Sequence, residues 1–409
     1  MQRKHKSDLV ILFATLGLMA LGLIVIYAIG PMRANVLNNT YGANYDPNYF
    51  FWGQLRSVGL SLLAFFAAFK WIPYKYIKKA AKPLMIAALV LSGLLWIMSL
   101  IGSSLVKCEL GECRWFDIGG VSFQPAELLK LALVIYLADF LARKREEGVV
   151  GKLREFWAPF LTVCGISLFL VVIAQGDLGT GVAIIAIMLG TLLISGLPAK
   201  QYLIFLAIIL IGAVGAVAFS GHRMERVDAW LTTLTGGEST DSTYHVDNAM
   251  LAIGVGGLTG VGIGNSVQAT GYLPESINDS VFAIMGETFG FVGLFLIIAV
   301  FAILLMRMLK VSEYAPDNES RILVAGVFSW TLAQVAVNIM AMTGLVPVTG
   351  ITLPLLSYGG TSMIFIAFAI GLVLQLSCYT SREVNIKNEN ISSGRGQRGT
   401  HYSSRRRSS

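Results

Sequence analysis

Charged side chains are scarce in this chain. Asp, Glu, Lys and Arg make up 13% of its 409 residues, while 55% are hydrophobic. Soluble globular proteins carry about 25% charged residues, so the composition excludes an ordinary soluble domain and indicates a polytopic membrane protein. The net charge of +7 does not indicate a nucleic-acid partner, because the basic residues gather in short loops and in the C-terminal tail.

Cysteine is also rare, with four residues in the chain. Cys164 and Cys378 lie in or at the end of apolar runs and are expected in the core. Cys108 and Cys113 flank a short polar loop without accompanying metal ligands, so no metal site is predicted there. They are candidates for a local disulfide if the loop faces an oxidising compartment. No cofactor is evident, and a requirement for a divalent cation stays open.

Several apolar runs reach the roughly 20 residues that a membrane-spanning helix needs, and we predict an all-α polytopic membrane protein with ten transmembrane helices. The first run, residues 9–29, exceeds the apolar region of about 7–15 residues in a signal peptide. It is therefore expected to be an uncleaved span after a cytoplasmic N-terminus at residues 1–8. The transmembrane domain is expected at 9–378, with spans at 9–29, 51–69, 83–102, 126–142, 157–174, 179–196, 201–220, 281–308, 322–343 and 357–378.

The orientation of the spans follows from the basic residues. With the N-terminus in the cytoplasm, most Lys and Arg residues fall in the inside segments, as the positive-inside rule requires. Four unusual segments then lie outside, at 108–124, 175–180, 221–280 and 344–362. The third is a large extracytoplasmic loop between helices 7 and 8, and its length of about 60 residues indicates a functional segment. The active region is therefore predicted on the outer side.

The end of the chain has a different composition. Residues 379–409 are polar and rich in Ser, Gly and Arg, so we predict a disordered, basic cytoplasmic tail. Contact with anionic lipid headgroups or a cytoplasmic partner is one role for it, and a solvated segment that only sets the orientation is the other.

Two acidic residues, Asp279 and Glu287, stand where the large outer segment enters the eighth span. A charge at a membrane boundary is costly unless it faces a cavity or a partner, so these residues are candidates for a functional site. The structural alternative is that Asp279 and Ser280 cap the next helix.

A second group of polar residues surrounds the start of the fourth span. Pro125 suits the first turn of a helix, which puts Glu127 and Lys130 on one helical face. They can form a mutually satisfied buried pair. Together with Arg114, Lys130 can instead provide two fixed cations that suit a phosphate or pyrophosphate group.

Other outer segments supply weaker signals. Arg223 and Arg226 open the large loop, and Tyr244 and a lone His245 follow. The glycines of residues 254–264 lack the context of a nucleotide site and predict tight turns or close helix approach. Gly, Pro and hydroxyl residues over 343–362 predict irregular backbone lining a polar cavity.

On these residues the chain resembles the SEDS family, the FtsW/RodA/SpoVE peptidoglycan polymerases of bacteria. Four segments carry the resemblance: 114–130, 175–180, 273–290 and 347–362. Residues 136–143, residues 353–362 and the basic tail favour an FtsW-like subtype. The resemblance implies polymerisation of lipid II, a disaccharide-pentapeptide on undecaprenyl pyrophosphate, at the outer face of the bacterial cytoplasmic membrane during septal wall synthesis. It implies a class B penicillin-binding protein transpeptidase and divisome or elongasome proteins as partners.

The resemblance also assigns residues. The family's essential Asp, in a Leu-Pro-Glu-x-x-x-Asp motif, matches Asp279, and Arg114 and Lys130 match its required Arg and Lys. Gly271 departs from the pattern, because the family often has an acidic residue there, and Glu275 is a weaker substitute for a second carboxylate. Around the catalytic Asp279, the expected substrate and pyrophosphate ligands are Arg114, Lys130, Glu127, Gln124, Arg223, Arg226, Tyr244, Glu275, Ser357, Thr361 and Ser362.

Other functions fit part of the same pattern. A transporter or flippase of a lipid-linked cell-wall precursor would also use an outward cavity with cations, but its polar groups should cross the whole membrane. A RodA-type elongation polymerase is the alternative within the family. A scaffold that only recruits a division partner would not need Asp279 or Lys130.

Overall fold

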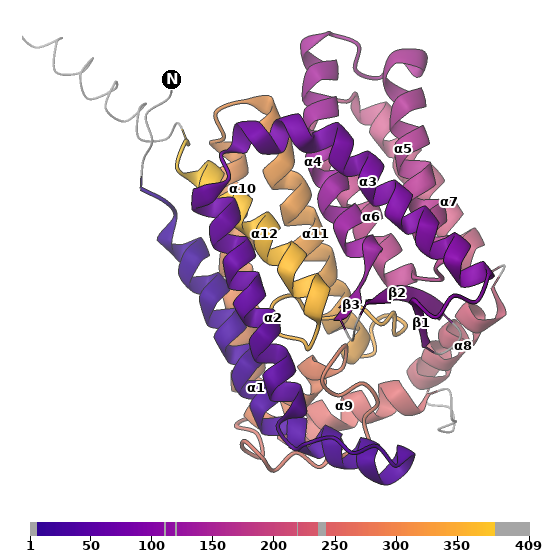
Figure 1. The fold of residues 1–409 in the computed structure, drawn as a ribbon, viewed down its shortest axis with the longest axis vertical. Helices are drawn as coiled ribbons and strands as arrows, with labels where there is room; N and C mark the ends of the chain where they lie inside the picture. The colour runs from indigo at the N-terminus through magenta and orange to yellow at the C-terminus, as the bar shows by residue number, and fades with distance from the viewer. Residues whose placement is uncertain (1–5, 110–111, 119–120, 219, 236–242, 381–409) are drawn as a thin grey trace, which may run out of the picture.

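Eight helices of the described residues are long and apolar enough to cross a membrane. The computed structural model describes residues 6–109, 112–118, 121–218, 220–235 and 243–380 (Figure 1). The predicted tail at 379–409 therefore lies almost entirely outside the described residues. The eight spans are α1 (Leu9–Tyr41), α2 with η1 (Tyr49–Phe66, Ala67–Trp71), α3 (Tyr74–Leu100), η2–α5–η3 (Leu153–Trp157, Ala158–Leu168, Phe169–Ala174), α7 (Ala199–Ala218), α10 (Val281–Glu313), α11 (Asn318–Met342) and α12 (Gly360–Ser377).

Two further helices occupy predicted spans but differ in character. Helix α6 (Leu178–Ile194) is apolar and has 17 residues, which is short for a span. Helix α4 (Pro125–Glu146) carries Glu127, Lys130 and Asp139, and it is buried on nearly all sides. Protein rather than lipid surrounds α4, so it tolerates charges that a lipid-facing helix would not. The chain is thus a mostly helical, multi-span membrane protein, and the count of ten spans stays a prediction.

Both ends of the described chain lie at one end of the bundle (Figure 1). The amide of Asp8 donates to Ser377 Oγ at 3.1 Å, and the carboxylate of Asp8 pairs with Arg307 at 2.6 Å. Figure 1 shows the strands, α8 (Gly221–Thr235) and α9 (Tyr244–Gly256) toward the opposite end. The irregular segments with the candidate site residues therefore lie away from the termini, toward the other end of the bundle.

A small antiparallel sheet corrects the all-α expectation. Strands β1 (Val106–Glu109), β2 (Glu112–Ile118) and β3 (Val121–Phe123) are joined in that order. Cys108 pairs with Cys113 across β1 and β2, and a disulfide joins them. The sequence suggested a plain loop because each strand is short and its residues alternate only weakly. The hairpin is closed by the disulfide and held beside α3 and α4.

The segment 221–280 is not a plain loop either, because α8, α9 and a short turn of 3-10 helix, η4 (Gln268–Thr270), fold within it. Its glycines allow close packing on α10, as the sequence predicted. A Cβ on Gly256 would lie 2.0 Å from the Gly286 carbonyl oxygen, and one on Gly260 would lie 2.2 Å from that of Thr288.

Helix α10 is interrupted where this segment crosses it. Gly290 has φ 65° and ψ −168°, which breaks the helical backbone. Val261 N donates to Glu287 O at 2.9 Å and Phe291 N donates to Gly257 O at 2.8 Å, so the neighbouring segment satisfies the groups that the break releases. The first turns of α10 therefore belong with segment 221–280 rather than with one uninterrupted span.

Glu287 has a structural role in this arrangement. Its side chain is 1% exposed and accepts hydrogen bonds from the amides of Val267 (2.9 Å) and Gln268 (3.2 Å) and from Ser266 Oγ. A buried carboxylate with this many donors is fully occupied. Of the two acidic residues at the boundary, only Asp279 is left as a candidate for chemistry.

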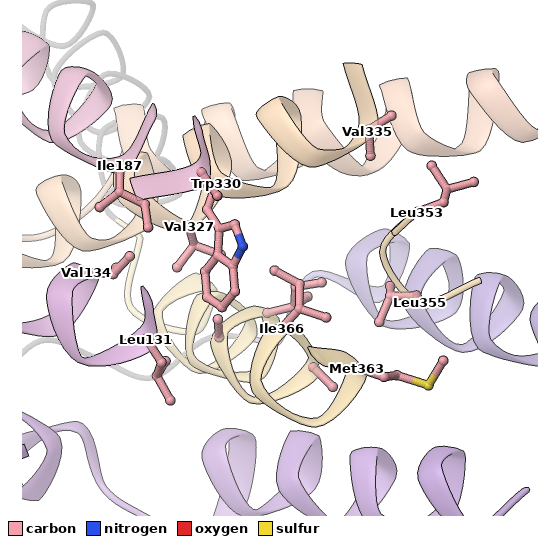
Figure 2. Close-up of a cluster of buried hydrophobic side chains, with 14 of the residues drawn as sticks. Leu131, Val134, Ile187, Val327, Trp330, Val335, Leu353, Leu355, Met363 and Ile366 are labelled. Atoms are coloured by element: carbon pink, nitrogen blue, oxygen red, sulfur yellow. The ribbon is translucent and has the colours of Figure 1, made fainter. Parts of the chain in front are cut away.

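Helix α11 packs against α4, α6 and α10 at the centre of the bundle. Trp330 of α11 is fully buried. Figure 2 shows its ring beside side chains of α4, α6, α11 and α12, namely Leu131, Val134, Ile187, Val327 and Ile366. This apolar layer supports the polar segments that lie nearer the end of α11.

Candidate active site

Asp279 lies in the turn that precedes α10 and is 7% exposed. Ser280, at the N-cap of α10, makes no side-chain capping bond. Ser280 Oγ instead donates to Pro274 O at 2.8 Å and lies 3.5 Å from Asp279 Oδ1. The structure therefore gives no support to helix capping as the role of this pair.

The surroundings of Asp279 suit a general base. Burial and the negative charge of Glu275 raise the pKa of its carboxyl, Arg226 opposes the rise, and the resulting pKa is about 7. A base works best when its pKa lies near the working pH, because it is then partly ionised and still basic enough to accept a proton. A buried acid with a perturbed pKa beside a cation is a typical functional-site arrangement.

His245 also belongs to this cluster, although it was not among the predicted site residues. It lies in the first turn of α9, and its Nε2 is 2.7 Å from Ser280 Oγ. Burial and the nearby Arg226 lower the pKa of His245 to about 4. The imidazole is therefore neutral at pH 7 and links α9 to the turn that carries Asp279. Only the fold shows that the ring is half-buried against this turn.

The two arginines of α8 have different surroundings. Arg226 donates to Val348 O at 3.3 Å, and its charge acts on both Asp279 and His245. Arg223 donates to Ala216 O at 2.9 Å and Val172 O at 2.6 Å. Arg223 thus links the C-terminal parts of α7 and η3, while Arg226 belongs to the Asp279 cluster.

Helix α11 and its connection to α12 hold the backbone of the turn that carries Asp279. Asn338 Nδ2 donates to the backbone oxygens of Asp279 and Ile351, both at 2.7 Å. Tyr358 N donates to Ile277 O at 2.8 Å. Ser357 Oγ accepts from Leu353 N at 2.8 Å, so Ser357 shapes this connection. Residues 343–362 were predicted to line a polar cavity, and part of their polar groups instead form an internal hydrogen-bond network.

Thr361 and Ser362 lie in the first turn of α12 and are half-buried. They extend the polar surface that begins at the α11–α12 connection.

A second cluster forms at the N-terminus of α6. Arg114 of β2 pairs with Glu112 and donates to Gly176 O at 3.1 Å. Gln124 Nε2 donates to Asp177 Oδ2 at 3.0 Å, and Asp177 caps α6 by accepting from Thr180 N at 2.9 Å. The fold thus brings Arg114 and Gln124 to the same helix N-terminus.

The α11–α12 connection joins the two clusters. A Cβ on Gly179, in the first turn of α6, would lie 2.7 Å from Ile351 Cγ1 and 3.0 Å from Thr349 O. Ile351 in turn shares Asn338 with Asp279. One continuous chain of contacts therefore runs from the α6 N-terminus to the turn that carries Asp279.

Lys130 lies deeper than these clusters. Its Nζ is 2.8 Å from Glu127 Oε1 and 5.0 Å from the centroid of the Trp330 ring, and both charged side chains are buried. Trp330 precedes Asn338 by eight residues on α11, which corresponds to about 12 Å along a helix axis. The structure has Glu127 and Lys130 as a buried pair, and removing either partner of such a pair costs about 3–5 kcal/mol.

The remaining predicted residues lie on the side facing α1. Glu275 has a left-handed backbone (φ 48°), pairs with Arg33 of α1 at 3.3 Å and accepts from Asn278. Tyr244 is 44% exposed at the start of α9. Arg33 is the site neighbour that sequence reasoning missed, since a lone Arg at the end of a long helix carries no signal.

Metal ligands do not cluster in the part of the chain that the structure describes, where no three His, Cys, Asp or Glu side chains are placed to share an ion.

Comparison with known proteins gives consistent relatives. A family model described as "Cell cycle protein", for FtsW, RodA and SpoVE, matches residues 8–382. The stage V sporulation protein E of Bacillus subtilis (strain 168) is 33% identical over 380 residues, covering 92% of this chain and 99% of that protein. A probable peptidoglycan glycosyltransferase FtsW of Enterococcus hirae is 31% identical over 405 residues, covering 96% of each.

Solved structures share the fold. The rod shape determining protein RodA of Thermus thermophilus matches with a TM-score of 0.63 at 25% identity, covering 92% of this chain and 97% of RodA. A chain from a peptidoglycan synthase complex that coordinates polymerization and crosslinking matches with a TM-score of 0.69 at 24% identity, covering 91% and 97%. The family match across most of the chain and the similarity to the sporulation protein together show that this chain belongs to the FtsW, RodA and SpoVE family of cell cycle proteins.

Proposed function

We propose that this chain is a peptidoglycan glycosyltransferase that polymerises lipid II into glycan strands at the outer face of the bacterial cytoplasmic membrane. Relatives named as probable peptidoglycan glycosyltransferases support the activity. The buried Asp279 carboxyl, with a pKa near 7 beside Arg226, carries the assignment of the base. The outer location is supported by the basic residues at the termini end of the bundle.

The proposed reaction is an inverting displacement. Asp279 accepts the proton of the acceptor sugar's 4-hydroxyl, and the oxygen forms a bond to the donor's anomeric carbon. The bond from that carbon to the pyrophosphate oxygen breaks, and undecaprenyl pyrophosphate leaves with the electron pair. We assign Arg114 and Arg226 to stabilising the charge on the leaving group. Lys130 would have to leave its buried pair with Glu127 to join them.

Septal wall synthesis in cell division, as in an FtsW-type enzyme, is the proposed setting, with a class B penicillin-binding protein as partner. The similarity in fold to a chain from a peptidoglycan synthase complex supports a partnered enzyme. A RodA-type role in elongation is the alternative, because the relatives include both branches.

The decisive experiment is polymerisation of labelled lipid II by purified protein. We expect Asp279→Asn to lower the rate by about 10²–10⁴-fold, the usual contribution of general base catalysis. Asp228→Asn, which alters an exposed carboxylate of α8, is the matched control and should retain the rate. Equal glycan yield from the wild type and Asp279→Asn would remove the base assignment, and lipid scrambling without polymer would favour a transporter or flippase.

A further inference from the structure

A groove separate from the cationic clusters lies between α1 and the segment that leads to Asp279. It has a volume of about 630 Å³, within the range of small-molecule sites. The lining residues are Met32, Asn35, Val36, Asn39, Thr40, Tyr244, Thr270, Gly271 and Tyr272.

The lining combines amides and hydroxyls with aromatic faces and contains no charged side chain. Asn35 and Asn39 are exposed, and four residues apart on α1 they project from one face. Neither amide is engaged by another group within the described part of the chain. Tyr272 is 54% exposed and Tyr244 is 44% exposed. Free amides can donate to and accept from hydroxyl groups, and exposed tyrosine rings offer flat apolar faces with a polar tip.

Gly271 determines both the shape and the neutrality of the groove. Its φ of 124° strains any other residue, and a Cβ there would lie 3.2 Å from Val36 Cγ2. The glycine therefore lets the 270–272 segment approach α1. It also stands where the family often has an acidic residue, so this chain has no carboxylate in the groove.

The groove lies beyond the lipid and beside the reacting centre. Helix α1 has 33 residues, so it is about 50 Å long, whereas the hydrocarbon layer is about 30 Å thick. The last turns of α1 thus extend past the membrane. The ion pair of Arg33 and Glu275 closes the gap between α1 and the segment that reaches Asp279 four residues later.

From this lining and place we infer, resting on the proposed function, that the groove binds uncharged saccharide units of the glycan strand. Pyrophosphate does not suit it, because none of the lining side chains is cationic. The groove would hold sugar units of the strand while the cationic clusters hold the leaving pyrophosphate. Strand retention would then determine how many units are added before release.

Binding can be measured without turnover, using peptide-free glycan oligosaccharides and saturation-transfer NMR on the full-length protein. We expect Asn35→Ala/Asn39→Ala to bind the oligosaccharides about tenfold more weakly. Each lost hydrogen bond should weaken binding about threefold. Tyr272→Ala should also weaken binding, and Tyr272→Phe should restore it because the ring face remains. Tyr76→Ala is the control, since Tyr76 has the same 54% exposure on α3.

The polymerisation assay gives the second readout. The double asparagine variant should produce shorter strands than the wild type, and Tyr76→Ala should produce strands of wild-type length. Melting temperatures identify any variant that fails to fold, in which case the Tyr272→Phe and Tyr272→Ala pair decides. Wild-type protein that does not bind the oligosaccharides, or variants that bind them equally well, would overturn the inference. Oligosaccharide binding without any polymer from lipid II would instead overturn only the proposed function.

Discussion

At the scale of single residues, the chemistry depends on how the charge of Asp279 is balanced. Burial and Glu275 raise the pKa of Asp279, whereas Arg226 lowers it, and the outcome is a value of about 7. The half-buried His245 is neutral at this pH and adds no compensating charge. The ionisation of one carboxyl should therefore determine how the rate varies with pH.

The pH profile of lipid II polymerisation tests this balance. The base must be ionised, so the rate should rise about tenfold per pH unit below pH 7 and level off above it. Arg226→Gln should move the midpoint to higher pH, because the arginine favours the ionised carboxylate. Arg223→Gln is the matched control from the same helix, since its guanidinium holds backbone oxygens of α7 and η3. A midpoint that stays in place in Arg226→Gln would contradict the electrostatic coupling.

At the scale of elements, the site depends on close packing between α9 and α10. The break at Gly290 and the hydrogen bonds from residues 257–262 hold the first turns of α10 against the outer segment. Asp279 precedes these turns directly. The position of the base therefore depends on glycines that contact no substrate.

Two glycines of α9 provide a direct comparison. Gly256→Ala should destabilise the protein by more than about 1 kcal/mol and lower activity, because its Cβ would meet the Gly286 carbonyl oxygen at 2.0 Å. Gly254→Ala, in the same helix, has nothing within 4 Å of its Cβ. It should be neutral or stabilise by up to about 1 kcal/mol, since alanine favours the helix. Thermal unfolding in detergent distinguishes the two, and similar melting temperatures for both variants would argue against the tight contact.

At the scale of the whole molecule, the two ends of the bundle differ in structure. The termini lie at one end, and the sheet, α8 and α9 lie toward the other (Figure 1). His245 of α9 contacts Ser280, so the turn with Asp279 lies with α9. The Cys108–Cys113 disulfide is at the second end, which fits an oxidising exterior.

Cysteine labelling in intact spheroplasts tests this orientation. In a Cys108→Ser/Cys113→Ser background, the remaining Cys164 and Cys378 are buried. Asn39→Cys should react with a membrane-impermeant maleimide in intact cells, whereas Tyr76→Cys should react only after permeabilisation. The reverse pattern would place Asp279 in the cytoplasm and rule out the proposed reaction.

The sequence by itself determined the class of protein, the approximate helices and the candidate base. Long apolar runs leave few alternatives to membrane-spanning helices, because backbone groups in lipid must be satisfied within each segment. Local patterns likewise marked Asp279, Arg114 and the glycines as unusual.

Only the tertiary structure decided which of these residues act together. Burial and long-range contacts gave Asp279 and Glu287 different roles, and they did the same for Arg226 and Arg223, although each pair looks alike in sequence. They also brought His245 to Ser280 and opened the uncharged groove beside α1, since both depend on segments more than 30 residues apart. Desolvation and charge coupling are properties of the packed molecule, so no local pattern could have supplied them.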